Sequence, residues 1–414
     1  MDGTKLYFCF EATNIQQEHV YLLYSAKVSD LICKASDSTP KFTMEVVISG
    51  GFPSMGCGVF GSKIVLAGGL VVQGRTVVPN YGLITYDTAS KHVSREDIPP
   101  MYGHKLRPLV FPLNNKLFVL DTSCYVDDMS FEIWSPKKKL WRQLQSHYFD
   151  MCIRYDINEA ICRRAPYSWF VFGNCLCVSL PTDMHTYFHH ARQFSKSFNP
   201  RFQGPLPFSG MATTLCQQGF SDVVVISFSK GCVEGRRVNI AMSVYDYSLG
   251  PPQIIFETEP SNGELSSYFA DCGDGRFCLT TFDNVNIHVY MFKIRRRRDK
   301  KDGALNLHLI SKIMHKYDLS NFSTGGNTSF SFLGCFAPAR DDRNKQSEEA
   351  KIYHRYFPVF EYAKSSGDIC KTKEKDDDDI PLTVDTITAE LERVPGSRNM
   401  WSKIPGASHI QPNE

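Results

Sequence analysis

The sequence has no long hydrophobic run, no excess of charge of either sign and no familiar catalytic signature. Its longer apolar stretches, such as residues 169–180, contain Gly173 and Asn174 and fall short of the ~20 residues that a membrane helix requires. Lys and Arg together number 46 against 44 Asp and Glu, so neither nucleic acid nor an anionic membrane is expected as a partner. The patterns GxSxG, HExxH, the P-loop and a GxGxxG after a strand are all missing, which argues against the common enzyme classes.

A secretory leader and a disulfide framework are also not expected. The opening residues, MDGTKLYFCFEATN, have no basic start, no sustained apolar centre and no small-residue cleavage site. The 14 cysteines lie mostly inside apolar runs such as RFCLTTF at residues 276–282. These features predict reduced thiols and a location in the cytosol or the nucleus.

What the sequence does contain is clearest between Gly56 and Pro99. Four short strand-like runs follow one another there, and alternate residues of Ile64–Gly68 point to opposite faces, as in a pleated strand. A diglycine, Gly68-Gly69, follows the second run, and a Tyr86-Asp87 pair lies in the third. A four-stranded sheet of this size leaves both faces and both edges open, so neighbouring sheets of the same kind are expected.

The same four-run pattern recurs along the chain, and its second run is the easiest to align. These runs begin about fifty residues apart, a period typical of kelch-type propellers and longer than the WD type. They start at Lys5, Lys63, Lys116, Cys175, Asp222 and Arg276. Short Gly- and Asn-containing turns precede several of these runs, as antiparallel hairpins require. The chain therefore carries six expected units.

Ring closure follows from the two ends of this region. The first unit lacks an initial strand, whereas a lone run, Thr328–Phe336, follows the sixth unit. Pairing this run with the N-terminal strands completes a sixth sheet and removes a free edge. We predict an all-β, six-bladed β-propeller over residues 1–338. In the fourth unit, the outermost strand has to come from the proline-containing residues 195–204.

Residues 339–414 form a charged tail that is rich in Pro, Gly and Ser in its last part, and they are expected to be largely disordered. Two segments in the tail depart from that composition. Residues 351–363 are aromatic, and residues 384–394 place Ile387, Leu391 and Val394 on one helical face. Whether these segments contact the propeller or a partner stays open.

Gly68-Gly69, Tyr86-Asp87 and the Trp134 to Trp141 spacing resemble the kelch repeat, in which a diglycine after the second strand is followed by a Tyr and a Trp. The chain is similar to plant kelch-like proteins without an assigned catalytic activity and to the propeller half of plant F-box/kelch proteins. No F-box-like segment precedes Lys5. The resemblance implies a non-catalytic interaction module, with a ubiquitin-ligase component whose F-box is on another chain as the alternative.

The expected binding surface consists of the long loops, which join second to third strands and one unit to the next. In a propeller, both loop classes emerge on the same face, and residues 70–80, 100–107, 123–129, 146–166 and 229–237 are assigned to them. Arg and Tyr, which anchor many protein interfaces, are frequent there. The candidate residues are Arg75, Tyr102, Arg107, Tyr125, Asp127, Asp128, Arg154, Tyr155, Arg163, Arg164, Arg236 and Arg237.

A basic cluster, Arg295, Arg296, Arg297 and Arg298, lies between the expected third and fourth strands of the sixth unit. It fits a solvated turn, with nuclear import or anion binding as the alternatives. His185, His189 and His190 lack a carboxylate or cysteine at a typical zinc spacing and are interpreted as blade residues.

No cofactor and no metal are expected. Galactose oxidase is a kelch-type enzyme, which makes a propeller enzyme a further alternative, but no residues matching its copper ligands are found. The expected partner is a protein or peptide, and the chain is expected to be a monomer.

Overall fold

The structure is a computed structural model, and the residues it describes lie in one of the two compact units of the chain, the one made of residues 1–191 and 200–359. The described residues are 4–13, 18–33, 39–73, 76–113, 115–121, 131–144, 168–172, 175–179, 186–190, 205–216, 223–241, 246–259, 266–283, 285–297, 305–322 and 329–338. The tail segments 351–363 and 384–394 therefore lie outside the described residues. No described helix is long and apolar enough to cross a membrane.

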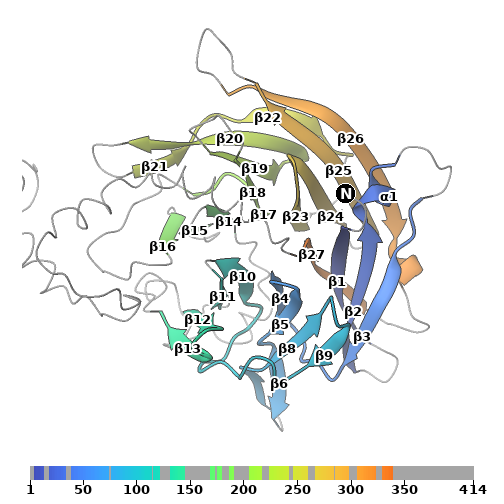
Figure 1. The fold of residues 1–414 in the computed structure, drawn as a ribbon, viewed down its shortest axis with the longest axis vertical. Coiled ribbons are helices and arrows are strands. Elements are labelled where there is room, and N and C mark those ends of the chain that lie inside the picture. The colour runs from blue at the N-terminus through green and yellow to red at the C-terminus, as the bar shows by residue number, and fades with distance from the viewer. Residues whose placement is uncertain are drawn as a thin grey trace, which may run out of the picture. The chain divides into compact units, whose positions relative to one another are not determined.

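Six sheets follow one another in chain order and form a six-bladed β-propeller (Figure 1). Each sheet contains one of the second strands that the fifty-residue period predicts, and each of these strands pairs antiparallel with the next strand of its sheet. These second strands are β1 (Lys5–Thr13), β5 (Lys63–Ala67), β11 (Lys116–Leu120), β15 (Cys175–Ser179), β19 (Val224–Ser229) and β24 (Arg276–Phe282). The predicted architecture is confirmed.

Blade 1 joins the two ends of the propeller. Its strand order is β27 (Ser329–Phe336), β1, β2 (His19–Lys27) and β3 (Thr43–Ser49), with the short helix α1 (Val28–Leu31) after β2. β27 runs antiparallel to β1 over the register from Tyr7↔Phe336 to Thr13↔Ser329. The closing strand expected at residues 328–336 is thus confirmed.

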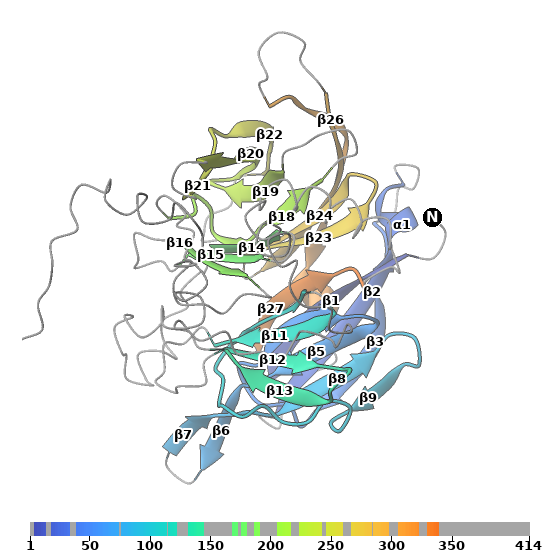
Figure 2. The same ribbon diagram turned by 60° about the vertical axis from the view of Figure 1, so that its left-hand side comes forward.

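Blades 2 and 3 have the predicted order of four strands. Blade 2 contains β4 (Gly56–Phe60), β5, β8 (Leu83–Asp87) and β9 (His92–Ser94), and blade 3 contains β10 (Leu109–Leu113), β11, β12 (Phe131–Ser135) and β13 (Leu140–Gln143). Between β5 and β8 the chain forms an additional hairpin, β6 (Leu70–Gln73) and β7 (Thr76–Pro79), whose strands pair only with each other among the described residues. Figure 2 shows this hairpin extending away from the sheet of blade 2.

Blade 4 is made of β14 (Ser168–Phe172), β15, β16 (Thr186–His190) and the two-residue strand β17 (Gly210–Met211), which pairs parallel with β14. The outer strand expected from residues 195–204 lies outside the described residues. β17 continues almost directly into β18 (Thr213–Leu215), the first strand of blade 5.

Blade 5 departs from the prediction. Its third strand, β20 (Cys232–Ala241), begins directly after β19 and pairs with both β21 (Asp246–Leu249) and β22 (Gln253–Glu257). Lys230 and Gly231 have φ values of 49° and 77°, the left-handed conformation of a two-residue hairpin turn. The long loop expected at residues 229–237 and the third strand expected from Asn239 are therefore wrong.

Blade 6 has the longest strands: β23 (Ser266–Gly273), β24, β25 (Asn286–Arg296) and β26 (Leu307–Asp318), followed by a 3₁₀ turn at Leu319–Phe322. Leu319 N–H donates to the Val285 carbonyl at 3.0 Å. This bond ties the connection toward β27 to the turn that joins β24 and β25.

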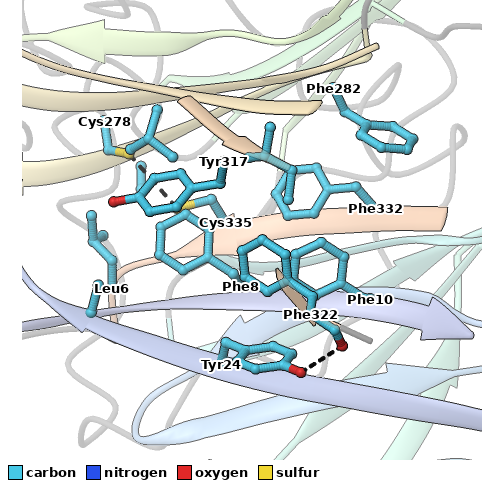
Figure 3. Packing of buried hydrophobic residues seen from close by; sticks show 14 of the residues in the cluster. Leu6, Phe8, Phe10, Tyr24, Cys278, Phe282, Tyr317, Phe322, Phe332 and Cys335 are labelled. Atoms are coloured by element: carbon cyan, nitrogen blue, oxygen red, sulfur yellow. Dashed lines mark hydrogen bonds between the residues drawn. The ribbon is translucent and has the colours of Figure 1, made fainter. Parts of the chain in front are cut away.

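The core lies between adjacent blades, where alternate strand residues of facing sheets interdigitate. The largest cluster joins blades 6 and 1 and is rich in aromatic rings (Figure 3). Phe10 of β1 is fully buried, with its ring centroid 5.1 Å from that of Phe322 and 5.2 Å from that of Phe332. The Tyr24 hydroxyl donates to the Phe322 carbonyl at 2.8 Å. Apolar burial at this seam therefore holds the closing strand in the ring.

Glu45 of β3 is a polar link between blades 1 and 2. Its side chain is 2% exposed and accepts hydrogen bonds of 2.6 Å from both the Lys5 ammonium and the Ser25 hydroxyl. Lys91, in the turn before β9, donates to the other carboxylate oxygen. Burial alone raises the pKa of Glu45, but the bonds from Lys5, Lys91 and Ser25 outweigh it and bring the pKa to about 2.

Glu45→Gln is expected to remove a pH-dependent contribution to stability. The carboxyl pKa is about 2 when folded and near 4.5 when unfolded, so the stabilisation is complete above the unfolded value and is lost as the pH falls toward 2. It amounts to something on the order of 3 kcal/mol at neutral pH. Urea unfolding at pH 7 and pH 3 measures it, with exposed Glu96→Gln as the control. An equal difference between wild type and Glu45→Gln at both pH values would contradict this account.

Candidate docking surface

Two loops meet on one end of blades 2 and 3, and backbone hydrogen bonds join them. They are residues 69–73 and 76–82, between β5 and β8, and residues 99–108, between β9 and β10; we call them together the loop surface. Gly69 N–H donates to the Lys105 carbonyl at 2.9 Å, and Lys105 N–H donates to the Asn80 carbonyl at 2.8 Å. Met101 N–H donates to the Tyr81 carbonyl at 3.0 Å. The second-to-third loop and the inter-blade loop thus share one face here.

The diglycine allows this close approach. Gly68 and Gly69 have φ values of 71° and 104°, in the region that favours glycine. A Cβ on Gly68 would lie 2.5 Å from the Lys105 carbonyl oxygen, and one on Gly69 would lie 2.8 Å from Phe52 Cβ. The backbone therefore bends at the end of β5, as the sequence suggests, and it does so against the neighbouring loop.

Gly68→Ala is expected to destabilise the protein by about 2–3 kcal/mol. The new methyl group clashes with a backbone carbonyl, and alanine also has to adopt the left-handed φ. Gly61→Ala is the matched control. Gly61 has φ 60° and nothing within 4 Å of the added Cβ, so it carries the backbone cost alone, about 1 kcal/mol. Urea unfolding compares the two variants. Equal losses would show that the contact with Lys105 has no energetic effect.

A buried ion pair supports residues 99–108 from below. Lys105 and Glu132 of β12 are both 0% exposed, and Lys105 Nζ lies 2.6 Å from Glu132 Oε1. Glu132 also accepts the backbone N–H groups of Tyr102 at 2.8 Å and Gly103 at 2.9 Å, while Lys105 Nζ donates to the Gly103 carbonyl at 3.2 Å. Such a pair is tolerated in the interior because several further hydrogen bonds satisfy it.

Two more contacts hold the same loop to blade 3. The Trp141 indole N–H of β13 donates to the Pro99 carbonyl at 2.7 Å, and Trp141 packs on Trp134 with ring centroids 5.7 Å apart. Leu106 N–H donates to Asp121 Oδ1 at 3.0 Å at the end of β11. The loop is therefore fixed at its start, at its centre and near its end.

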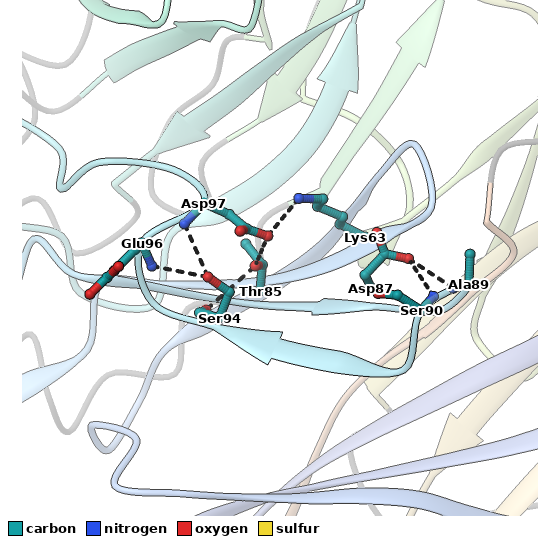
Figure 4. Close-up of polar contacts among 8 residues, drawn as sticks. All are labelled: Lys63, Thr85, Asp87, Ala89, Ser90, Ser94, Glu96 and Asp97. Carbon is teal, nitrogen blue, oxygen red and sulfur yellow. Dashed lines mark hydrogen bonds and ion pairs between the residues drawn. The ribbon is translucent and has the colours of Figure 1, made fainter.

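The segment that leads from β9 into the loop is held by Asp97 (Figure 4). Asp97 Oδ2 accepts hydrogen bonds from Lys63 Nζ at 2.5 Å and from the Thr85 hydroxyl at 3.0 Å. The Ser94 hydroxyl oxygen accepts the N–H groups of Glu96 and Asp97, both at 3.1 Å. The hydrogen bonds from Lys63 and Ser94 hold the pKa of Asp97 below its usual range.

The loop surface carries exposed aromatic side chains. Tyr102 is 54% exposed and Tyr81 is 45% exposed. The rings of Tyr81 and the exposed His104 lie with their centroids 5.3 Å apart. Tyr and His combine an apolar body with a polar tip, and large exposed aromatics held by a fixed backbone are suited to protein contacts.

Of the residues that the sequence assigns to a docking face, the structure places two on the loop surface. Tyr102 is exposed there. Arg107 is half-buried, has φ 48°, and donates its N–H to the Ser54 carbonyl at 3.1 Å. Most of the others lie outside the described residues: Arg75, Tyr125, Asp127, Asp128, Arg154, Tyr155, Arg163 and Arg164.

The structure corrects the expected placement of Arg236 and Arg237 in a loop. Both lie within β20, opposite Val225 and Val224 of β19, and neither is in a loop. Arg236 Nε donates to Glu234 Oε1 at 2.8 Å, with the two side chains 15% and 7% exposed. Arg236 therefore belongs to a largely buried polar contact within blade 5. Both arginines lie in a strand because the Lys230-Gly231 turn starts the third strand early.

The basic cluster is also placed differently from the expectation. Arg295 and Arg296 are the last two residues of β25, and Arg296 is 6% exposed. Arg297 follows the strand, is exposed, and donates its N–H to the Asn306 carbonyl at 2.9 Å. Arg298 lies outside the described residues. The expected solvated turn is therefore wrong for Arg295 and Arg296, which lie in a strand. Arg296 is buried and is not available as part of an exposed basic patch.

Four residues contribute to the loop surface although the sequence does not single them out. Tyr81 follows the predicted loop directly, and extending that loop by two residues to Gly82 includes it. His104 and Lys105 lie inside the expected loop at residues 100–107, but they are not among the Arg and Tyr residues expected to anchor an interface. Glu132 carries no sequence signal, because a strand glutamate next to apolar residues is not distinguished from an exposed one.

Within the part of the chain that the structure describes, no group of three or more His, Cys, Asp or Glu side chains is arranged to hold a metal ion. His189 and His190 are the last residues of β16, opposite Leu176 and Cys175 of β15. His185 lies outside the described residues.

Comparison with known proteins gives structural similarity only. No family model matches the chain, and no curated protein matches it. The β-propeller domain of Cps50 (Swd1) from Myceliophteria thermophila is 13% identical with a TM-score of 0.31, covering 70% of this chain and 84% of that one. A protein from Lactobacillus plantarum is 9% identical with a TM-score of 0.39 over 75% and 82% of the two chains. Kluyveromyces lactis Hsv2 is 9% identical with a TM-score of 0.33 over 73% and 97%.

Proposed function

We propose that this six-bladed propeller is a kelch-type, non-catalytic interaction module that binds a protein or peptide through its loop surface. Support for the kelch type comes from Gly68 and Gly69 at the end of β5, the buried Tyr86 and the Trp134–Trp141 pair. The module works as a monomer in the cytosol or the nucleus.

The observation that carries the proposal is the pairing of exposed aromatics with a rigid base. Tyr81 and Tyr102 are about half exposed, whereas Lys105 and Glu132, which hold the same loops, are 0% exposed. A preformed loop loses little conformational entropy on binding, which favours affinity. Tyr is also enriched among the residues that contribute most of the binding energy near the centres of protein interfaces.

The hairpin β6–β7 extends the same surface. Its sequence, LVVQGRTVVP, is apolar except at Gln73, Arg75 and Thr76, and its two strands pair only with each other among the described residues. An isolated two-stranded hairpin is marginally stable in water. A partner segment that adds a strand to its edge supplies the missing main-chain hydrogen bonds.

The test compares affinity capture by the full chain, by Tyr81→Ala/Tyr102→Ala and by Leu140→Ala. Leu140 is 53% exposed on β13 and is the matched control for loss of exposed apolar area. Partners identified by mass spectrometry with the full chain are expected to be kept by Leu140→Ala and lost by the double variant. A chain stopped after Pro338 separates partners of the tail from partners of the propeller. Retention of every propeller partner by the double variant would refute the proposal.

A further inference from the structure

Two cysteines face each other across the seam that closes the ring. Cys278 lies in β24 of blade 6, and Cys335 lies in the closing strand β27 of blade 1. Their sulfur atoms are 3.9 Å apart, and the residues are 0% and 2% exposed (Figure 3). The Cys278 thiol also lies 3.7 Å from the Thr280 hydroxyl. This thiol pair therefore spans the contact between blade 6 and blade 1.

From this geometry we propose that Cys278 and Cys335 form an oxidative modification site, at which hydrogen peroxide converts the two thiols into a disulfide that fastens the closing strand to blade 6. One sulfur attacks peroxide, which releases water and leaves a sulfenic acid. The second sulfur then attacks the sulfenic sulfur, forming the S–S bond and releasing a second water. Two thiols and one peroxide thus give one disulfide and two waters. The sulfurs have to approach by about 2 Å to reach bonding distance.

The surroundings determine when the reaction occurs. The contact with Cys335 and burial both raise the pKa of the Cys278 thiol, and a protonated thiol is a poor nucleophile. The closed ring therefore reacts slowly. Opening of β27 brings the pair into contact with water and peroxide, and reclosure then places the sulfurs together again. Peroxide therefore oxidises those molecules in which β27 has separated from blade 6. The disulfide then keeps β27 in contact with blade 6.

A covalent bond at this place has a specific mechanical effect. β27 is held in blade 1 by its ladder to β1, whereas its contact with blade 6 is made by side chains. The disulfide adds a covalent link on that side and closes a loop that runs from residue 278 to residue 335. Cross-linking of distant residues restricts the unfolded ensemble and raises the unfolding temperature.

A second pair of thiols provides an internal comparison. Cys9 of β1 and Cys57 of β4 are hydrogen-bonded to each other between blades 1 and 2, and Cys57 is half-buried. This pair does not join the two ends of the propeller. A disulfide there leaves the seam between blades 6 and 1 unchanged.

The experiment treats the full-length chain with hydrogen peroxide or with dithiothreitol, maps disulfide-linked peptides by mass spectrometry without reduction, and records thermal unfolding. We expect a Cys278–Cys335 linked peptide, a rise in unfolding temperature of roughly 3–8 °C, and reversal of both by dithiothreitol. Low, non-denaturing urea is expected to speed formation of the bond because it favours opening of the seam.

Cys335→Ser is expected to abolish the linked peptide and the temperature rise, whereas Cys33→Ser, which alters an exposed cysteine, keeps both. The wild-type peptide map shows whether the Cys278–Cys335 disulfide forms, even if Cys335→Ser folds poorly. A map that contains only a Cys9–Cys57 bond, or no bond, overturns the proposal. A Cys278–Cys335 bond that leaves the unfolding temperature unchanged overturns the fastening role.

Discussion

Glu132→Ala is expected to destabilise the protein by about 3–5 kcal/mol, because it leaves the Lys105 ammonium buried without its counter-ion. Both side chains are 0% exposed, so water cannot replace the lost carboxylate. The N–H groups of Tyr102 and Gly103 lose their acceptor as well. Urea unfolding measures the loss, and faster amide hydrogen exchange at Tyr102 and Gly103 locates it in the loop surface.

Two further variants distinguish burial of a charge from loss of a contact. Lys105→Met/Glu132→Leu removes both charges and is expected to recover much of the stability. Lys63→Met breaks the pair with Asp97, in which both side chains are 32% exposed, and is expected to cost less than about 1 kcal/mol. A loss below 1 kcal/mol for Glu132→Ala would show that the pair contributes nothing to the support of the loop.

A chain stopped after residue 328 is expected to lose cooperative unfolding, whereas a chain stopped after Pro338 keeps it. The shorter chain lacks β27, so β1 loses a pairing partner from Tyr7 to Thr13 and Phe10 loses the ring of Phe332. Even Phe332→Ala, which keeps the strand, is expected to cost about 3–5 kcal/mol, since Phe332 is 3% exposed.

Circular dichroism during thermal unfolding, together with binding of a hydrophobic dye, measures this effect. Leu309→Ala is the control for Phe332→Ala, because Leu309 is 36% exposed on the outer strand β26 and its truncation is expected to change stability little. A cooperative transition in the chain stopped at 328, at the temperature of the longer one, would mean that ring closure is not needed for the fold.

The ring was predictable because its signals repeat. An apolar second strand occurs six times, several times directly after a short turn, and the excess strand at residues 328–336 matches the strand that the first unit lacks. Alternation within Ile64–Gly68 depends only on local sequence, so a single sequence is enough to recognise it. Gly68 and Gly69 adopt positive φ values that glycine tolerates without steric cost, which is consistent with the bend expected after this strand.

The site was predictable only in part, since it depends on contacts between distant residues. Tyr102 was found because it lies in a long loop. Lys105 and Glu132 are 27 residues apart, and nothing in their neighbours distinguishes a buried pair from two exposed charges. Arg236 and Arg237 were misplaced because Lys230-Gly231 was not recognised as a hairpin turn, although a glycine between two alternating runs is compatible with one.

The pairing of β27 with β1 also has a consequence for biosynthesis. The first strand leaves the ribosome long before its partner, because Thr13 and Ser329 are opposite each other in the finished ladder. At the ~5–20 residues per second typical of translation, the intervening chain takes roughly 15–60 s to make. During that time Phe8 and Phe10 lack part of their final cover, so the nascent N-terminal strands are expected to be chaperone substrates until the last strand emerges.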